Sequence, residues 1–133
     1  MSRRTIQVSF AIALMNVMTL GLVGPAAGDV TLGRRSYPAD LSIEYDQAHD
    51  RFEGNLDTAS FCQGARLVSV YEVRPGSDRL VGRDKTNRRG IYEVENANGR
   101  TGNFYARTLV SLRGEGERLC KGDKSDTIQV TEP

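Results

Sequence analysis

Ala65-Arg-Leu-Val-Ser-Val-Tyr-Glu-Val73 is the most apolar stretch of the chain after its first 28 residues. Its side chains alternate, so Val68 and Val70 fall on one face and Leu67, Tyr71 and Val73 fall on the other. An apolar period of two, rich in β-branched and aromatic residues, is typical of a β-strand. Arg74-Pro75-Gly76-Ser77-Asp78 follows as a turn, in which Pro presets φ and Gly supplies a permissive position.

The same period of two recurs on both sides of this strand. Segments rich in Gly or Asn, at 86–90 and 96–99, separate the further strands, and we expect Gly90 to take a positive φ. The predicted strands are 41–45, 52–56, 65–73, 79–85, 91–95, 103–112 and 127–130. This pattern predicts an all-β fold: a single antiparallel β-sandwich of about seven strands over residues 40–133. A small closed barrel is the alternative, because periodicity does not separate the two.

The N-terminal segment has the three parts of an export signal. Arg3 and Arg4 are followed by an apolar run over residues 6–23, and Ala26 and Gly28 supply the small residues that a signal peptidase requires. We therefore expect residues 1–28 to be a signal peptide, residues 29–39 to be a linker or disordered N-terminus, and the protein to be secreted. An uncleaved anchor helix is the alternative, with a run near the lower limit for crossing a bilayer.

The chain has two cysteines, Cys62 and Cys120, at the two ends of the patterned region. In an exported domain one disulfide between them is the expected arrangement, and two free thiols are the alternative. In the chain-entropy description, closing this loop of about 59 residues stabilises the fold by about 4 kcal/mol at most.

The charge pattern limits the class of partner. The formal net charge is +1, and residues 1–28 carry two Arg and no acidic residue, so the predicted mature chain has a net charge of −1. The full chain has 15 Arg, and those after residue 28 alternate with Asp and Glu along the sequence. The doublets Arg34-Arg35 and Arg88-Arg89 are expected to be solvated loops. We attribute the excess of Arg over Lys to genome composition. Nucleic acid is not an expected partner, because it requires a basic face.

Several segments carry a family resemblance. Phe52-Glu53-Gly54, Arg66 to Tyr71, Gly82 to Thr86, Gly90 to Val94 and Gly102 to Arg107 resemble the carboxypeptidase regulatory-like, or transthyretin-like (prealbumin-like), β-sandwich domains. The resemblance covers residues 50–131. It implies a Greek-key sandwich that serves as an accessory or structural module. The chain departs from the family pattern at Asn87, where an Asp is usual, and in its cysteine pair.

Few residues are available for catalysis. His49 is the single histidine, in the polar turn 46–50, so a Ser-His-Asp triad or a multi-His metal site lacks parts. Hydroxyisourate hydrolases, which share the transthyretin-like fold, need several His and a C-terminal Tyr-Arg-Gly-Ser, whereas this chain ends Thr-Glu-Pro. Alternation places Glu93 and Glu95 on one outward face, as a solvated edge. We predict no enzyme activity, no catalytic residue, no metal and no cofactor.

Two classes of ligand, Ca²⁺ and glycan, have candidate residues in the sequence. The loops 84–90 and 123–126 are rich in oxygen ligands but also contain basic residues, which oppose Ca²⁺, so both are expected to be hydrogen-bonded turns. The aromatic side chains that a glycan platform needs are Tyr45, Tyr71, Tyr92 and Tyr105, and their alternation with apolar residues favours packing in the core or across neighbouring strands. The sequence thus predicts a secreted, non-catalytic scaffold or interaction module with an extracellular protein or cell-surface partner. A module that binds glycan or cell-wall polymer is the alternative, and a hydrolase ranks third.

Overall fold

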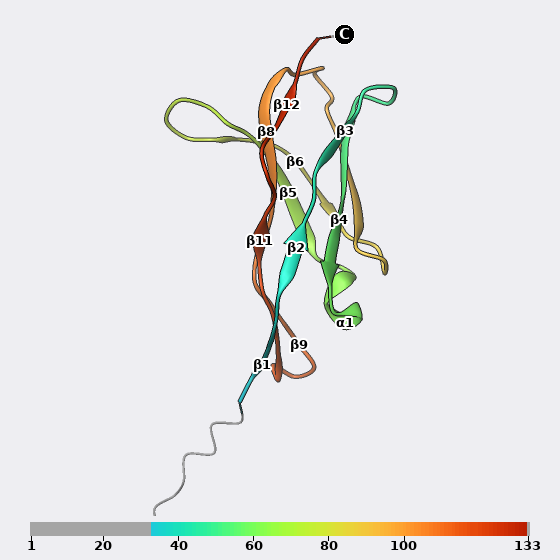
Figure 1. The fold of residues 1–133 in the computed structure, drawn as a ribbon, viewed down its shortest axis with the longest axis vertical. Coiled ribbons are helices and arrows are strands. Elements are labelled where there is room, and N and C mark those ends of the chain that lie inside the picture. The colour runs from blue at the N-terminus through green and yellow to red at the C-terminus, as the bar shows by residue number, and fades with distance from the viewer. Residues whose placement is uncertain (1–32, 133) are drawn as a thin grey trace, which may run out of the picture. The chain divides into compact units, whose positions relative to one another are not determined.

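The computed structural model describes residues 33–132, which form an all-β fold with one short helix (Figure 1). The predicted signal peptide and residues 29–32 lie outside the described residues. The elements are β1 Arg35–Tyr37, β2 Ala39–Leu41, β3 Glu44–Asp46, β4 Arg51–Thr58, α1 Ser60–Gln63, β5 Leu67–Glu72, β6 Arg79–Lys85, β7 Ile91–Glu95, β8 Gly102–Thr108, β9 Ser111–Arg113, β10 Arg118–Cys120, β11 Asp123–Lys124 and β12 Ile128–Val130. Because α1 has four residues, no described helix is long enough to cross a membrane.

Strand β4 is the centre of the first sheet. β2 and β3 follow one another along one side of β4, with Leu41 opposite Leu56 and Tyr45 opposite Phe52. β7 pairs antiparallel with β4 as well, and Val94 lies opposite Phe52. All three pairings are antiparallel, as the sequence predicted.

The second sheet has β8 and β5 in the middle. β6 pairs with the outer side of β5, and β11 and β12 pair with β8 at successive positions. A register shift lies between Val70 and Tyr71, where β5 meets β6. None of the sheets formed by residues 33–132 closes on itself, so the barrel alternative is wrong.

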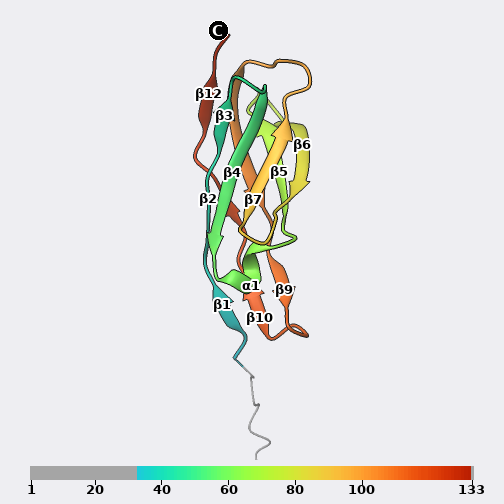
Figure 2. The same cartoon turned by 90° about the vertical axis from the view of Figure 1, so that its right-hand side faces the viewer.

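The two sheets face each other across one hydrophobic core (Figure 2). Phe52 from the first sheet and Phe104 from the second are fully buried, with ring centroids 4.7 Å apart. Val68 and Val70, which share one face of β5 as the alternation predicted, are also fully buried. Tyr92 is 1% exposed, its hydroxyl donates to the carbonyl of Ser42 at 2.7 Å, and burial raises its pKa.

The disulfide between Cys62 and Cys120 is present, which confirms the predicted pairing. It joins α1 to the end of β10, both half-cystines are fully buried, and their Cα atoms are 5.7 Å apart. β10 belongs to a small third sheet, in which it pairs with β9 and, in parallel, with β1. Residues 35–37, which were expected to belong to a linker over 29–39, are therefore part of the fold as β1. Tyr37 lies opposite Cys120 and packs edge-on against Phe61, with ring centroids 4.6 Å apart.

The strand predicted over residues 103–112 is interrupted. β8 ends at Thr108 and β9 begins at Ser111, and the two strands belong to different sheets. Gly122 passes so close to this break that a Cβ there would lie 2.6 Å from the Thr108 carbonyl oxygen. The chain therefore leaves the second sheet at Leu109 and Val110, which belong to no strand.

Gly90 has φ +83°, as predicted for the turn before β7. Its amide donates to the carbonyl of Asn87 at 3.0 Å, and its own carbonyl accepts from Leu56 at 2.9 Å. A Cβ at Gly90 would lie 2.4 Å from the Leu56 carbonyl oxygen. Both the backbone conformation and the space require glycine at this position.

Candidate functional site

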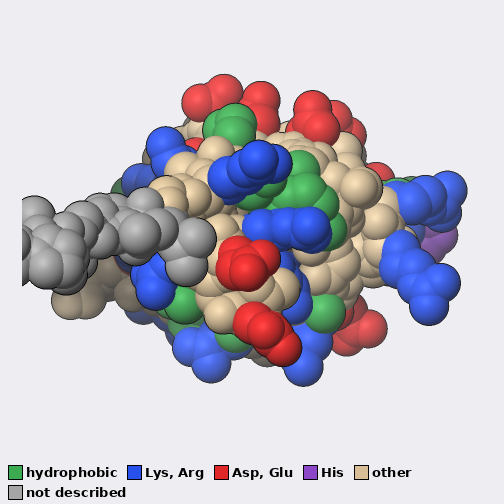
Figure 3. All heavy atoms as spheres, turned by 90° about the horizontal axis from the view of Figure 1, so that it is seen from below, with side chains coloured by type: hydrophobic (Ala, Val, Ile, Leu, Met, Phe, Trp, Pro, Cys, Tyr) green, Lys and Arg blue, Asp and Glu red, His purple; other side chains and the backbone are tan. Residues whose placement is uncertain are grey.

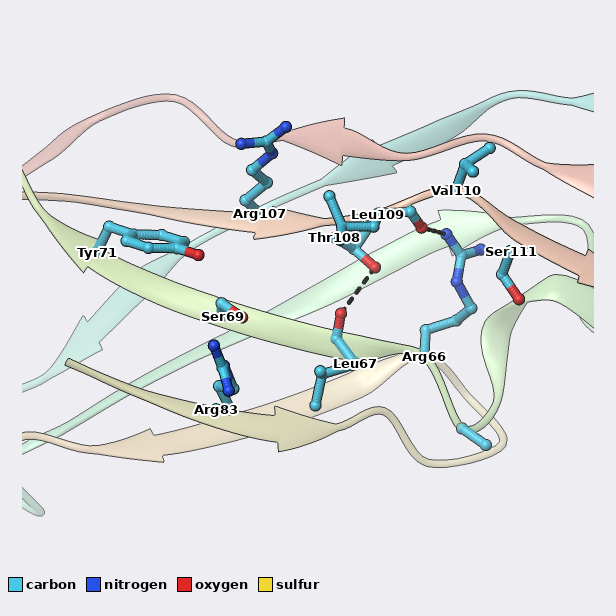
Figure 4. A pocket seen from close by; sticks show the side chains of 11 residues that line it. Arg66, Leu67, Ser69, Tyr71, Arg83, Arg107, Thr108, Leu109, Val110 and Ser111 are labelled. Atoms are coloured by element: carbon cyan, nitrogen blue, oxygen red, sulfur yellow. Dashed lines mark hydrogen bonds between the residues drawn. The ribbon is translucent and has the colours of Figure 1, made fainter. Parts of the chain in front are cut away.

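A groove of about 510 Å³ runs along the outer face of β5. Leu67, Ser69 and Tyr71 line it from β5, because alternate residues of a strand point to the same side (Figure 4). Val68 and Val70, between them, point into the core. Arg83 on β6 and Arg107 on β8 rise on either side of Ser69.

Cross-strand register places four polar side chains in one row across the second sheet. Ser69 is opposite Arg83 on one side and opposite Arg107 on the other, and Arg107 is in turn opposite Lys124. Neighbours in the row are about 4.8 Å apart, the spacing of paired strands. Within residues 33–132, neither arginine forms an ion pair. Both guanidinium groups are therefore available to an external anion.

Arg66 is a third arginine of the groove, and it is buried. Its side chain is 2% exposed, and its guanidinium donates to the carbonyl of Leu109 at 2.6 Å (Figure 4). The same guanidinium donates to the carbonyls of Cys62 at 3.3 Å and Lys121 at 2.9 Å. Burial lowers its pKa, and the charge of nearby Arg113 adds to the effect. The carbonyl oxygens accept three hydrogen bonds from Arg66, but no described carboxylate neutralises its charge. This charge makes the end of the groove electropositive.

Apolar side chains form the other part of the groove wall. Leu109 and Val110, in the link between β8 and β9, are 64% and 59% exposed, and Leu67 is 47% exposed. Figure 3, which views the molecule from the end where β1 and β9 lie, shows hydrophobic surface between basic side chains. The groove therefore offers apolar contact beside positive charge.

The next row of the same face is aromatic. Tyr71 and Tyr105 stack with ring centroids 5.4 Å apart, and the Lys124 ammonium lies 4.0 Å from the Tyr105 centroid. The Tyr105 hydroxyl donates to Asp78 at 2.9 Å. This hydrogen bond lowers the pKa of Asp78, and burial together with the same bond raises the pKa of Tyr105. Neighbouring side chains thus cover the ring of Tyr105.

The four tyrosines considered for glycan binding are spread over the molecule. Tyr92 and Tyr105 are buried, Tyr45 packs against Phe52 at 5.1 Å, and Tyr71 is half-buried in the groove. Their positions fit the predicted packing role. They do not form one exposed aromatic row on the described strands.

His49 lies in the turn between β3 and β4, as predicted. It is 67% exposed, and its Nδ1 is 2.6 Å from the Asp46 carboxylate. The hydrogen bond with His49 lowers the pKa of Asp46. His49 does not line the groove, so it is not positioned to act on the hydroxyl groups of the groove residues.

The oxygens of the two candidate calcium loops accept backbone hydrogen bonds. Asp84 accepts from the amides of Lys85 and Glu93, and Asn87 Oδ1 accepts from the amides of Arg89 and Ile91. In the other loop, Asp123 accepts from the amide of Leu41 at 2.8 Å. No group of three acidic, His or Cys side chains that could hold a metal occurs in the described part of the chain.

Sequence reasoning missed the three arginines of the groove. Arg66, Arg83 and Arg107 are far apart in the sequence and are separated by acidic residues, so they form no basic run. The available signal was alternation, which puts Arg83 on the same side of its strand as Lys85. Which strands are neighbours, and in which register, comes from the structure alone.

No protein-family model matches this chain, and no curated protein sequence matches it.

Proposed function

We propose that this protein is a secreted, non-catalytic interaction module that binds an acidic protein surface in the groove on β5. One observation carries the proposal. The groove lining contains Arg66, Arg83 and Arg107 but no Asp, Glu or His. Such a lining attracts carboxylates and provides no general base, so it favours binding over hydrolysis.

The apolar part of the groove supports a protein as the partner. Leu67, Leu109 and Val110 can pack against aliphatic side chains while the two exposed guanidinium groups pair with carboxylates. Sugar rings prefer exposed aromatic faces, and Tyr105 has its ring covered. A glycan or cell-wall module therefore remains the alternative with less support.

Secretion is part of the proposal. The signal-like features of residues 1–28 and the buried disulfide support an oxidising, extracellular location. The finer description of the fold is also proposed: if β2 and β3 count as one interrupted strand, and β11 and β12 as another, the two facing sheets have seven strands. That number supports the transthyretin-like sandwich that the sequence resembles, with β1, β9 and β10 as an addition.

The test uses a fluorescein-labelled hexaglutamate peptide and measures fluorescence anisotropy. We expect salt-dependent binding, and a loss of at least about tenfold in affinity for the double variant Arg83→Ala/Arg107→Ala. Arg88→Ala/Arg89→Ala is the matched control, since it removes the same charge from an exposed turn outside the groove. Equal affinities of the two double variants would refute the site. Binding of polygalacturonate in place of hexaglutamate would favour the glycan alternative.

A further inference from the structure

The outer face of the first sheet is acidic. Glu53 lies opposite Glu44 on one neighbouring strand and opposite Glu93 on the other, so three carboxylates form a row across β3, β4 and β7. Glu53 is 37% exposed and Glu93 is 53% exposed. Asp46 and Glu95 lie in the next row, on either side of Arg51. We call these five carboxylates the acidic face.

Arg51 compensates for part of this charge. Its guanidinium is 3.0 Å from Glu93, 3.2 Å from Glu53 and 3.5 Å from Asp46. One guanidinium against five carboxylates leaves the acidic face strongly negative. Like charges directly opposite one another across strands are unfavourable, so a cation brought to the row of glutamates would be stabilising.

The outer face of the second sheet has the opposite charge. Lys85, Arg83, Arg107 and Lys124 point outward there, since each lies opposite a groove residue or opposite another member of the set. The described strand positions of this face carry no carboxylate. We call these four residues the basic face.

The two faces match in spacing as well as in sign. Glu44 and Glu93 are two strands apart, with Glu53 on the strand between them. Arg107 and Arg83 are likewise two strands apart, and Ser69, a hydroxyl donor, is between them. Paired strands repeat at about 4.8 Å, so the outer members of each row are about 9.6 Å apart. Three carboxylates in a row on the acidic face therefore have the same spacing as a guanidinium, a hydroxyl and a guanidinium in a row on the basic face.

We propose that the acidic partner of the groove is the acidic face of a second copy of this chain. This inference rests on the proposed function and names the partner. Glu44 and Glu93 of one copy pair with the exposed arginines of the next, and Glu53 accepts from Ser69. Because the two faces lie on different sheets, the contact is head-to-tail. After each addition, an acidic face remains unpaired at one end of the assembly and a basic face remains unpaired at the other. Association then continues to short stacks.

The first test is sedimentation velocity of the disulfide-bonded protein from micromolar to millimolar concentration. We expect concentration-dependent association at low ionic strength and its loss at high ionic strength, because exposed charge pairs are screened by salt. A protein that stays monomeric at low ionic strength overturns the inference. If that monomer binds hexaglutamate, the proposed function stands and the partner is another acidic protein.

The decisive test mixes two variants. Arg83→Ala/Arg107→Ala has only the acidic face intact, and Glu53→Gln/Glu93→Gln has only the basic face intact. Each variant alone should self-associate at least tenfold more weakly than the unaltered protein. An equimolar mixture should form a one-to-one heterodimer and nothing larger, because each copy contributes one intact face. A mixture that remains monomeric overturns the inference, provided that circular dichroism shows both variants folded. Arg88→Ala/Arg89→Ala should associate like the unaltered protein.

Discussion

Replacing Arg66 by Met tests whether the buried guanidinium organises the region around the disulfide. Arg66 donates to three backbone carbonyls, those of Cys62, Leu109 and Lys121, which come from α1 and from the links after β8 and β10. Met keeps much of the aliphatic volume but has no donor. A buried polar group that loses its partner costs about 1–3 kcal/mol, so the three carbonyls together could cost several kcal/mol.

Two effects reduce that figure. Removing a buried charge without a counter-ion recovers some desolvation energy. The hydrogen bonds to the carbonyls of Leu109 and Lys121 are only partly buried, so water can replace the lost donors there. We therefore expect Arg66→Met to lower the free energy of unfolding by about 3 kcal/mol, measured by urea denaturation under oxidising conditions. Arg83→Met, at an exposed position of the same groove, should change it by less than about 0.5 kcal/mol. Similar effects of the two substitutions would show that Arg66 is not a structural centre.

The same measurement can be combined with loss of the disulfide. Replacing Cys62 and Cys120 by Ala should cost about 2–5 kcal/mol, as for other small secreted domains. Arg66 donates to the carbonyl of Cys62, so the two changes share one piece of structure. We expect Arg66→Met to cost less in the variant without the disulfide, a coupling of about 0.5 kcal/mol or more. If the free-energy costs of the two changes simply add, Arg66 and the disulfide stabilise the fold independently.

Three further outcomes follow from the described contacts. Gly90→Val should destabilise the fold by well over about 1 kcal/mol, measured by thermal denaturation, because it combines a positive φ with a backbone clash. Gly76→Val is the control and should cost less, since Gly76 also has a positive φ but has open space around it. Equal costs of the two substitutions would contradict the clash at Gly90. Tyr105→Phe should raise the pKa of Asp78 toward its usual value, as seen by carbon-13 NMR titration, since the Tyr105 hydroxyl holds that pKa down. The stability that this bond contributes is present above the unfolded-state pKa of Asp78 and is lost as pH falls through the folded-state pKa, so a pH profile unchanged by the substitution would refute the assignment. His49→Ala should leave stability within about 0.5 kcal/mol and any binding intact, and loss of binding with the fold preserved would place the site at this turn.

The strands were predictable because their signal is local. Alternation around Val68 and Val70 identifies β5 and the residues that share each of its faces, and Gly at the end of the 86–90 turn identifies the start of β7. The pairing of the two cysteines needed one further fact, the signal-like leader. The strands and the turn are inferred from residues that are close together in the sequence. The disulfide is inferred from the presence of only two cysteines, which allow a single pairing.

The candidate site was not predictable in the same way. Arg83 and Arg107 become neighbours of Ser69 only through the register of β6 and β8 on β5, and alternation does not specify register between distant strands. In the sequence Arg66 looks like an ordinary polar residue at the start of a predicted strand, and its burial depends on carbonyls up to 55 residues away. The interruption at Leu109 similarly depends on the close approach of Gly122.

The parallel pairing of β1 with β10 has a consequence for the order in which the chain can fold. Tyr37 lies opposite Cys120, and the amide of Leu41 donates to Asp123, 82 residues later. A chain that emerges from its N-terminus, during synthesis or export, cannot form these contacts until nearly all of it has appeared. The first described strand therefore cannot pair until the last quarter of the chain is present, and Cys62 cannot form its disulfide until Cys120 has been made. Such long-range closure favours slow folding, on the order of milliseconds to seconds, and leaves the early segment dependent on protection until the end arrives.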